Sequence, residues 1–120
     1  MENPLLTFAS PSIIVGDKSG VGVAIHEIAH SWTGNTVTCI NWSNMWINEG
    51  FTVFLERKAL GALKSFGADW VIIDSYDGNS ALITDINEYG ADESYSSLSP
   101  ITDGKNPDDS FSEIPYEKGY

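Results

Sequence analysis

The chain has 120 residues, 42% of them apolar and 12% aromatic, which allows one small hydrophobic core but not a large one. Six basic residues against seventeen acidic ones give a formal net charge of −11, which argues against nucleic acid and anionic membranes as partners. No run approaches the ~20 apolar residues of a membrane span, and no signal-peptide pattern opens the chain, so we expect a cytoplasmic protein. The single cysteine, Cys39, excludes an internal disulfide and predicts a buried or inert thiol.

The first fifteen residues contain two short stretches that favour extended structure. Residues 5–8 and residues 12–15 are rich in apolar and β-branched side chains, and Ser10-Pro11 separates them. We expect both stretches to be short extended segments.

The next stretch has the periodicity of a helix. Apolar residues at i, i+3, i+4 and i+7 predict a helix that begins near Val21 and stops at Gly34-Asn35. Asp17 or Ser19 is the candidate residue for its N-terminal cap. The predicted buried stripe consists of Val21, Ala24, Ile25, Ile28, Ala29 and Trp32.

The opposite side of that helix carries His26, Glu27 and His30. Two histidines four residues apart lie about one turn from each other on one side of a helix, so both can bind one metal ion. Glu27 lies beside them, close enough to a metal-bound water to take its proton. The alternative is a solvated helix with two idle histidines. That alternative does not explain why the chain has no other histidine, nor why a carboxylate lies between these two.

A second helix is predicted from about Trp46 to Ala62, and Glu49 near its start is the candidate third ligand. Glu56 lies two turns further along the same face. Histidines that bind zinc usually donate their other ring N–H to a carboxylate or carbonyl, and Glu56 is a candidate for that role. A local pair with Arg57 or Lys58 is the alternative for Glu56.

The type of this ligand set favours a catalytic metal. Two histidines, one glutamate and a water form the open kind of zinc site found in enzymes, whereas structural zinc is normally closed by four protein ligands, mostly cysteine. Because the chain has one cysteine, we expect one catalytic Zn²⁺ per chain.

The rest of the chain is less clearly patterned. Residues 70–73 are compatible with a strand or with a buried helix. Residues 82–89 repeat at helical spacing, with Ser80 as a candidate cap and Gly90 as the stop signal. Residues 91–110 are dominated by Ser, Asp, Gly and Pro, so we expect a loop.

These motifs together resemble the catalytic core of the gluzincin zinc aminopeptidases, and most closely the leukotriene A4 hydrolase/aminopeptidase branch. The matching stretches are Met1 to Pro4, Leu6 to Phe8, His26 to Asn35, Trp46 to Gly50, Leu55 to Arg57, and Pro115 to Gly119. The resemblance implies a mainly α fold with a small β element, that is, a truncated thermolysin-like catalytic domain. It implies one catalytic core over residues 1–120, without the family's flanking N- and C-terminal domains, and a helix rather than a strand at residues 70–73.

The resemblance also assigns the reaction. It implies that His26, His30 and Glu49 bind the zinc ion and that Glu27 is the general base and later the acid. The expected activity is hydrolysis of the N-terminal peptide bond by a zinc-bound water that Glu27 activates. The expected partner is a peptide or aminoacyl substrate with a free N-terminus.

Further residues receive roles from the same resemblance. Glu2 matches the glutamate that binds the substrate's free amino group, and Tyr116 matches the tyrosine that donates a hydrogen bond to the oxyanion. Asp108 aligns with an aspartate that serves the epoxide reaction in the leukotriene branch. Phe111 stands where that branch usually has a second tyrosine, and Tyr95 lies too early in the chain to replace it.

Three alternatives remain open. The first is a zinc-binding but weakly active fragment of a larger enzyme that self-associates into a homo-oligomer to cover exposed apolar faces. The second is an epoxide hydrolase of the leukotriene A4 type. The third is a non-enzymatic module that binds peptides in the same cleft.

Overall fold

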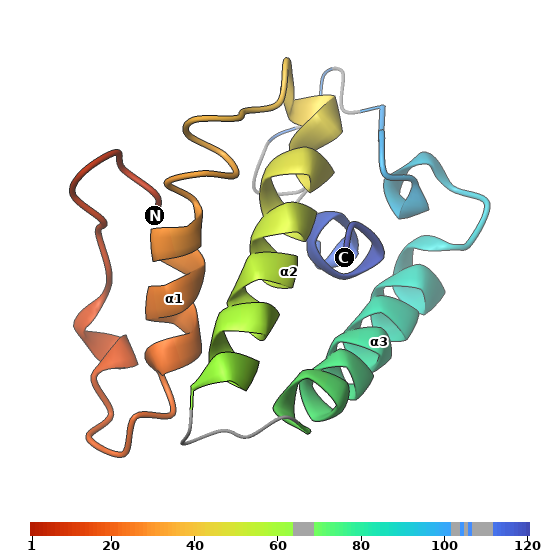
Figure 1. Cartoon of the computed structure of the whole chain (residues 1–120). Coiled ribbons are helices and arrows are strands. Elements are labelled where there is room, and N and C mark those ends of the chain that lie inside the picture. Colours follow the sequence, from red (N-terminus) through yellow and green to blue (C-terminus); the bar gives the residue numbers. More distant parts are fainter. Residues whose placement is uncertain (64–68, 102–103, 105, 107–111) are drawn as a thin grey trace.

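The computed structural model describes residues 1–63, 69–101, 104, 106 and 112–120. Regular structure within those ranges is helical, so the expectation of a mainly α protein is confirmed (Figure 1). The elements are α1 (Val21–Ala29), α2 (Met45–Ala62), α3 (Trp70–Tyr89) and the short turns η1 (Pro11–Ile13), η2 (Trp42–Asn44), η3 (Ser94–Ser96) and η5 (Ile114–Lys118). Among the helices of these ranges, none combines the length and the apolar character that a bilayer crossing requires.

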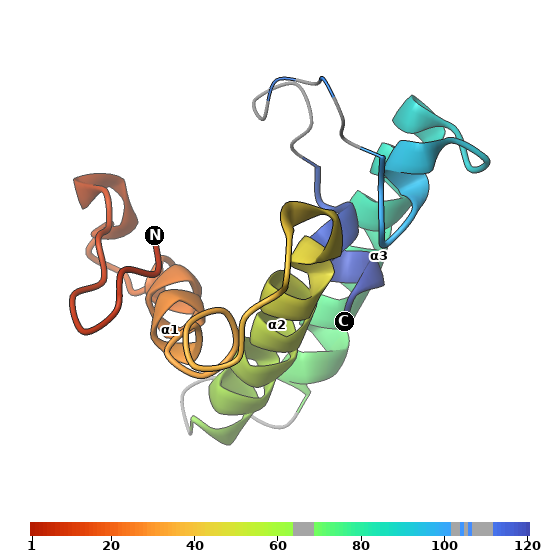
Figure 2. The same ribbon diagram turned by 90° about the horizontal axis from the view of Figure 1, so that it is seen from above.

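Helix α2 is the central element of the fold. It packs against α1 on one side and against η5 and α3 on the other, and two perpendicular views agree on this order (Figure 1 and Figure 2). The C-terminal turn η5 contacts both α2 and α3, whereas the N-terminal residues run beside α1. Side chains from α1, α2 and η5 can therefore meet in one place.

The interior around α2 is largely polar. In the described ranges the buried apolar residues are Ala29, Val53, Leu60 and Ile114. The buried polar residues of α2 are Asn48, Glu49, Thr52 and Arg57. Because a buried polar group costs free energy unless it is hydrogen-bonded or paired, each of these four needs a partner inside the fold. The buried side of helix α2 therefore faces a polar site more than an apolar core.

Helix α1 turns its histidine-bearing side toward α2. His30 is 2% exposed, whereas Ile28 and Trp32 of the predicted buried stripe are 56% and 62% exposed. The prediction of a buried stripe is therefore wrong for these two residues, although Ala29 is buried as expected. Ile28 is exposed because α2 presents carboxylates, which pair with imidazoles and not with aliphatic side chains. Trp32 lies outside the helix, because α1 ends at Ala29 and does not continue to Gly34-Asn35 as predicted.

The beginning of α1 also differs from the prediction. The N-cap residue is Gly20, and no side chain caps the helix. Asp17 instead accepts a hydrogen bond from the backbone N–H of Ser19, at 2.9 Å, within the turn that precedes the helix. A short polar side chain that bonds its own backbone neighbour in this way competes with helix capping.

The prediction of a small β element is wrong for the described residues, whose only bridge is an isolated one between Thr33 and Val37. Residues 5–8 include a turn closed by a hydrogen bond from Leu6 N–H to the carbonyl of Asn3, and residues 12–15 overlap η1. A strand needs a neighbouring strand to pair its backbone groups. Neither stretch has such a neighbour within this part of the chain.

Helix α3 is one continuous helix. It begins at Trp70, which confirms a helix for residues 70–73, and it ends before Gly90, whose φ is 95°. Ser80 lies in its interior and does not cap a separate helix. Its hydroxyl donates to the carbonyl of Tyr76, one turn earlier, at 3.0 Å. A serine can make this bond without breaking a helix, so the predicted cap at Ser80 is wrong.

Two glycines bring α2 and the C-terminal segment into backbone contact. A Cβ atom added to Gly50 would lie 2.5 Å from the carbonyl carbon of Gly119 and 2.6 Å from its Cα. Gly50 directly follows Glu49, and Gly119 comes three positions after Tyr116. This contact therefore determines how closely the tyrosine segment approaches the glutamate.

We expect Gly50→Ala to lower the free energy of unfolding by about 1–3 kcal/mol, the usual cost of adding a methyl group where there is no space. The added methyl would meet backbone atoms, which cannot rotate away. Gly61→Ala in the same helix is the comparison, because its added methyl would lie 2.6 Å from a side-chain methyl of Val71, which can shift, and not against backbone atoms. Urea denaturation of both variants measures the difference; equal losses of stability would contradict the importance of the backbone contact.

Candidate metal and catalytic site

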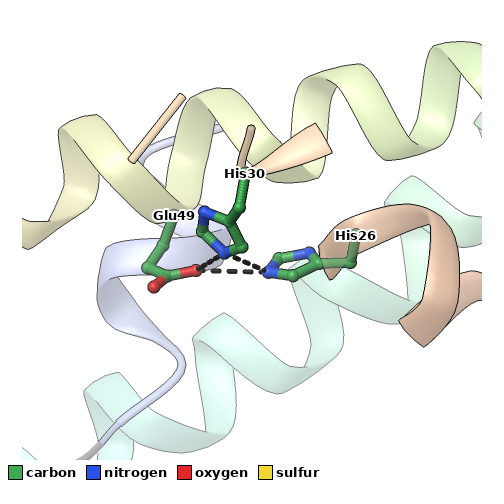
Figure 3. A group of neighbouring side chains, drawn as sticks. All are labelled: His26, His30 and Glu49. Atoms are coloured by element: carbon green, nitrogen blue, oxygen red, sulfur yellow. Dashed lines mark hydrogen bonds and ion pairs between the residues drawn. The ribbon is translucent and has the colours of Figure 1, made fainter. Parts of the chain in front are cut away.

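Three polar side chains from neighbouring elements point toward one another (Figure 3). His26 lies in α1, His30 is the C-cap of that helix, and Glu49 lies in α2. The two histidine Nε2 atoms are 3.1 Å apart. Oε2 of Glu49 lies 3.2 Å from Nε2 of His26 and 3.1 Å from Nε2 of His30. The fold thus brings the three residues that the sequence singled out as metal ligands to one point.

The other ring nitrogen of each histidine has a partner of its own. Nδ1 of His26 is 3.0 Å from Oε2 of Glu56, and Nδ1 of His30 is 2.8 Å from the carbonyl oxygen of Thr33. A carboxylate and a carbonyl can only accept a hydrogen bond, so both Nδ1 atoms carry hydrogen and donate it. In the neutral rings, both Nε2 lone pairs are then free at the point where Glu49 meets them.

This donor set fits a metal ion of the zinc type. Two nitrogen lone pairs and a carboxylate oxygen in contact need a positive charge between them. Imidazole nitrogens and a carboxylate oxygen are ordinary zinc donors, and two ligands about 2.0–2.1 Å from a tetrahedral zinc ion are about 3.3 Å apart. The separations of 3.1–3.2 Å are close to that value. The residues present therefore suit the metal that the motif predicts.

Burial and ion pairing act in opposite directions on this cluster. Burial lowers the pKa of His26, but hydrogen bonds to the carboxylates of Glu49 and Glu56 outweigh it and raise that pKa from 6.5 to about 9. Burial raises the pKa of Glu49, but the two histidines outweigh it and lower that pKa from 4.5 to about 2. The carboxylate is therefore charged at neutral pH, and a metal ion entering the cluster displaces protons from the imidazoles.

Glu56 lies beside His26 and makes no ion pair with its neighbours in α2. Its carboxylate accepts from the His26 ring, while Arg57 donates to two other carboxylates. The Lys58 ammonium lies over the ring of Phe54, 5.5 Å from its centroid. Of the two arrangements that the sequence left open for Glu56, the structure has the contact with histidine.

The residues that surround Nδ1 of His30 were not identified from the sequence. Gly34 has a φ of 124°, and a Cβ atom there would lie 2.7 Å from Nδ1 of His30, so both backbone and space require glycine. The fully buried hydroxyl of Thr52 lies 2.9 Å from the Thr33 carbonyl oxygen and 3.2 Å from Nδ1 of His30. The position of Thr52 three residues after Glu49, on the same helix face, was the available signal.

A second acidic group adjoins His30. One ligand atom each from Glu2, Glu27 and His30 lies within 4.8 Å of the other two. The Glu27 side chain is largely buried, and its Oε2 lies 2.6 Å from the amino group of Met1. Asn35 donates from Nδ2 to the backbone carbonyl of Glu2 at 2.7 Å, which holds the first residues against the turn after α1. Two carboxylates thus lie beside His30.

Tyr116 reaches the same site from η5. Its ring centroid lies 6.1 Å from that of His26, with the two planes tilted by 30°. Burial, followed by the negative charge of Glu49 and other nearby carboxylates, raises the pKa of Tyr116 above its ordinary value of 10. The phenol therefore keeps its proton at neutral pH and can donate a hydrogen bond.

The remaining residues singled out from the sequence lie elsewhere. Asp108 and Phe111 fall outside the described residues. The Tyr95 ring packs near that of Tyr89, with 5.8 Å between centroids. Cys39 is partly exposed, and its backbone N–H donates to Oδ1 of Asn48 at 2.8 Å.

All 120 residues match the Peptidase family M1 domain. The chain belongs to peptidase family M1. The resemblance inferred from the motifs is thereby confirmed. This M1 chain is 47% identical over 126 residues to leucine aminopeptidase 2 of Chaetomium globosum. It is 46% identical over 120 residues to the leukotriene A-4 hydrolase homolog of Botryotinia fuckeliana. Both alignments cover 100% of this chain, but 20% and 18% of the two relatives.

Solved structures show the same likeness in three dimensions. Native leukotriene A4 hydrolase from Saccharomyces cerevisiae superposes with a TM-score of 0.86 at 42% sequence identity. The yeast LTA4 hydrolase in complex with bestatin gives a TM-score of 0.87 at the same identity. Each superposition covers 99% of this chain and 19% of the other. The M1 chain therefore shares the fold of that region and spans about a fifth of the length of these relatives.

Proposed function

We propose that this chain carries the catalytic site of a zinc aminopeptidase, which hydrolyses the first peptide bond of a substrate with a free amino terminus. The observation that carries the proposal is the convergence of His26, His30 and Glu49 within 3.2 Å of one another, with Glu27 beside them. Membership of peptidase family M1 and the 47% identity to a leucine aminopeptidase support it.

His26, His30 and Glu49 would hold the zinc ion. A bound zinc ion supplies Lewis acidity, which polarises a peptide carbonyl and lowers the pKa of water toward neutrality. Glu56 would orient the His26 ring through Nδ1, and the Thr33 carbonyl would do the same for His30. With both rings held in one tautomer, the Nε2 atoms stay available as ligands.

Glu27 would be the general base. Its carboxylate accepts a proton from the attacking water and later returns that proton to the leaving amine. The position of Glu27 next to the ligand His30 supports this role, because a general base must first lie within hydrogen-bonding reach of the proton. Tyr116 would donate a hydrogen bond to the carbonyl oxygen as negative charge develops on it.

Glu2 would determine the requirement for a free amino terminus. A protonated amine donates charge-assisted hydrogen bonds to a carboxylate, and these are stronger than hydrogen bonds between neutral groups. Glu2 lies in the group with Glu27 and His30, and Asn35 holds its backbone. A substrate amine bound there would have its first peptide bond near the zinc ligands, as an exopeptidase requires.

The test compares turnover of an unblocked amino-acid anilide with that of its N-acetylated form, together with the zinc content of the purified protein. We expect stoichiometric zinc and turnover of the unblocked anilide only, because acetylation removes the positive charge that Glu2 binds. Turnover of both substrates alike would contradict an aminopeptidase and indicate an endopeptidase or an unspecific hydrolase. Stoichiometric zinc with turnover of neither substrate would also contradict the proposal and would favour a peptide-binding module.

The exposure of apolar side chains favours one alternative, a self-associating and weakly active form. The exposed apolar residues of α1 and α3 include Val23, Ile28, Ile72, Ile73, Tyr76 and Ile83. Exposed apolar side chains favour association where they form a contiguous patch. Light scattering, combined with activity per bound zinc, separates a monomeric enzyme from an associated protein of low activity.

A further inference from the structure

Arg57 is an arginine of α2 that is only 2% exposed and takes no direct part in the proposed reaction. Its Nε donates to Oδ2 of Asp74 in α3 at 2.6 Å. Its Nη2 donates to both carboxylate oxygens of Glu117 in η5, at 3.0 Å and 2.9 Å. One buried cation therefore joins three separate elements of the fold, and two carboxylates balance its charge.

The surroundings leave this network little freedom. Gly78 of α3 packs against Arg57 and Glu117 so closely that an added Cβ atom would clash with both. The aromatic ring of Tyr120 lies against the guanidinium, with 4.2 Å between Cζ of Arg57 and the ring centroid. An arginine inserted between carboxylates and an aromatic face is more strongly oriented than one in water.

We propose that Arg57, through Glu117, is the positioning residue for Tyr116. Glu117 directly follows Tyr116 in the chain, so fixing its carboxylate fixes the backbone from which the tyrosine ring reaches toward His26. Asp74 holds the guanidinium from α3, because its carboxylate accepts from Nε and its backbone carbonyl accepts from Nη2 at 3.2 Å. This inference rests on the proposed function only for its kinetic consequence; the placement of the Tyr116 ring can be tested without any activity.

Other contacts also hold η5 against the rest of the fold. The orientation of Tyr116 can therefore change while η5 stays attached. Ile114 of η5 is 1% exposed, and the Lys118 ammonium donates to the backbone carbonyl of Ser96 at 2.7 Å. Gly119 also contacts the backbone of Gly50. These contacts stay in place when the arginine is changed conservatively. A weakened Arg57–Glu117 pair is therefore expected to rotate or loosen η5 without releasing it.

The first experiment measures kcat and KM of the zinc-loaded protein with Arg57→Lys and Glu117→Gln. A lysine cannot donate in a fork to two carboxylates, and glutamine keeps the shape of Glu117 without its charge. We expect kcat to fall about ten- to a hundredfold and KM to change less than about twofold, because an oxyanion donor acts mainly in the transition state. Leu60→Val, at an equally buried position of α2 outside the network, is the control for general destabilisation and should keep kcat within about twofold.

A double-mutant cycle then tests whether the effect passes through the tyrosine. If Arg57 acts through Tyr116, Arg57→Lys should cause no further loss of kcat once Tyr116→Phe has removed the hydroxyl. Losses that multiply would overturn the inference, since the arginine would then act by another route. Full activity of Tyr116→Phe alone would contradict the catalytic role of Tyr116, which belongs to the proposed function.

A spectroscopic measurement decides the placement independently of activity. Labelling the five tyrosines with ¹³C at Cζ should give five resonances, and Tyr116→Phe assigns one of them. Arg57→Lys should shift or broaden the Tyr116 resonance, along with that of Tyr120, and leave those of Tyr89 and Tyr95 unchanged. An unaltered Tyr116 resonance would overturn the inference, whatever the kinetic result.

Discussion

Glu27→Gln should keep the zinc ion and reduce kcat by about 10³- to 10⁴-fold, at the upper end of what a general base contributes. Glutamine has the shape of glutamate but cannot accept a proton from water at neutral pH. Glu27 is also separate from the group of His26, His30 and Glu49, so its replacement removes no predicted ligand. The expected loss is therefore one of chemistry and not of metal binding.

The measurement is zinc per chain alongside anilide turnover for the native protein and the variant. Glu88→Gln is a matched control, because Glu88 is an exposed carboxylate of α3 and its neutralisation should leave kcat within about twofold. A Glu27→Gln protein that keeps zinc and retains most of its turnover would show that the proposed base is wrong. Loss of zinc in that variant would show that Glu27 is needed for metal binding and would contradict a role limited to proton transfer.

The second large effect is expected for Glu49→Ala, which should abolish stoichiometric zinc binding and turnover together. The Glu49 carboxylate is the only predicted ligand from α2, and it contacts both histidine Nε2 atoms. Without it, two imidazoles remain, and two neutral nitrogens hold zinc far more weakly than a set completed by a charged oxygen. A ligand that binds only the folded state stabilises it. The Glu49→Ala protein should therefore also lose the stabilisation that bound zinc supplies.

Glu56→Gln is the graded control for the metal site. It leaves all three predicted ligands in place and changes only the partner of His26 Nδ1. Changes of that kind typically weaken metal affinity about 10- to 100-fold. Competition with a chelator of known affinity measures both variants without any assay of activity. Equal zinc affinity of the Glu49→Ala and native proteins would remove Glu49 from the metal site.

Much of the candidate site could be predicted because its information is local. His26 and His30 are one helical turn apart, and Glu49 and Glu56 are two turns apart, so a helix of any orientation places each pair on one face. The short motifs at both ends of the chain pointed to Glu2 and Tyr116, and the fold brings both toward the histidines. The central helix could be predicted to within one residue of its start for the same reason.

Other predictions were wrong where the outcome depended on a distant partner. Apolar periodicity predicted a helix that buries Ile28 and Trp32, yet α1 ends at Ala29 and the carboxylates of α2 attract its histidine side. Residues 5–8 and 12–15 have the composition of strands, but no partner strand pairs with them in the described part of the chain. Hydrophobic pattern and propensity are weak preferences that tertiary contacts override.

The sequence by itself determined the types of the candidate ligands, their helical spacing and the family, because each depends on residues a few positions apart or on short motifs. Only the tertiary structure decided how Arg57 reaches Glu117, 60 positions away, and how Gly50 meets the C-terminal backbone. Such contacts depend on how α1, α2, α3 and η5 pack together as a whole, since a long-range pair forms only where the rest of the fold brings its two ends within reach.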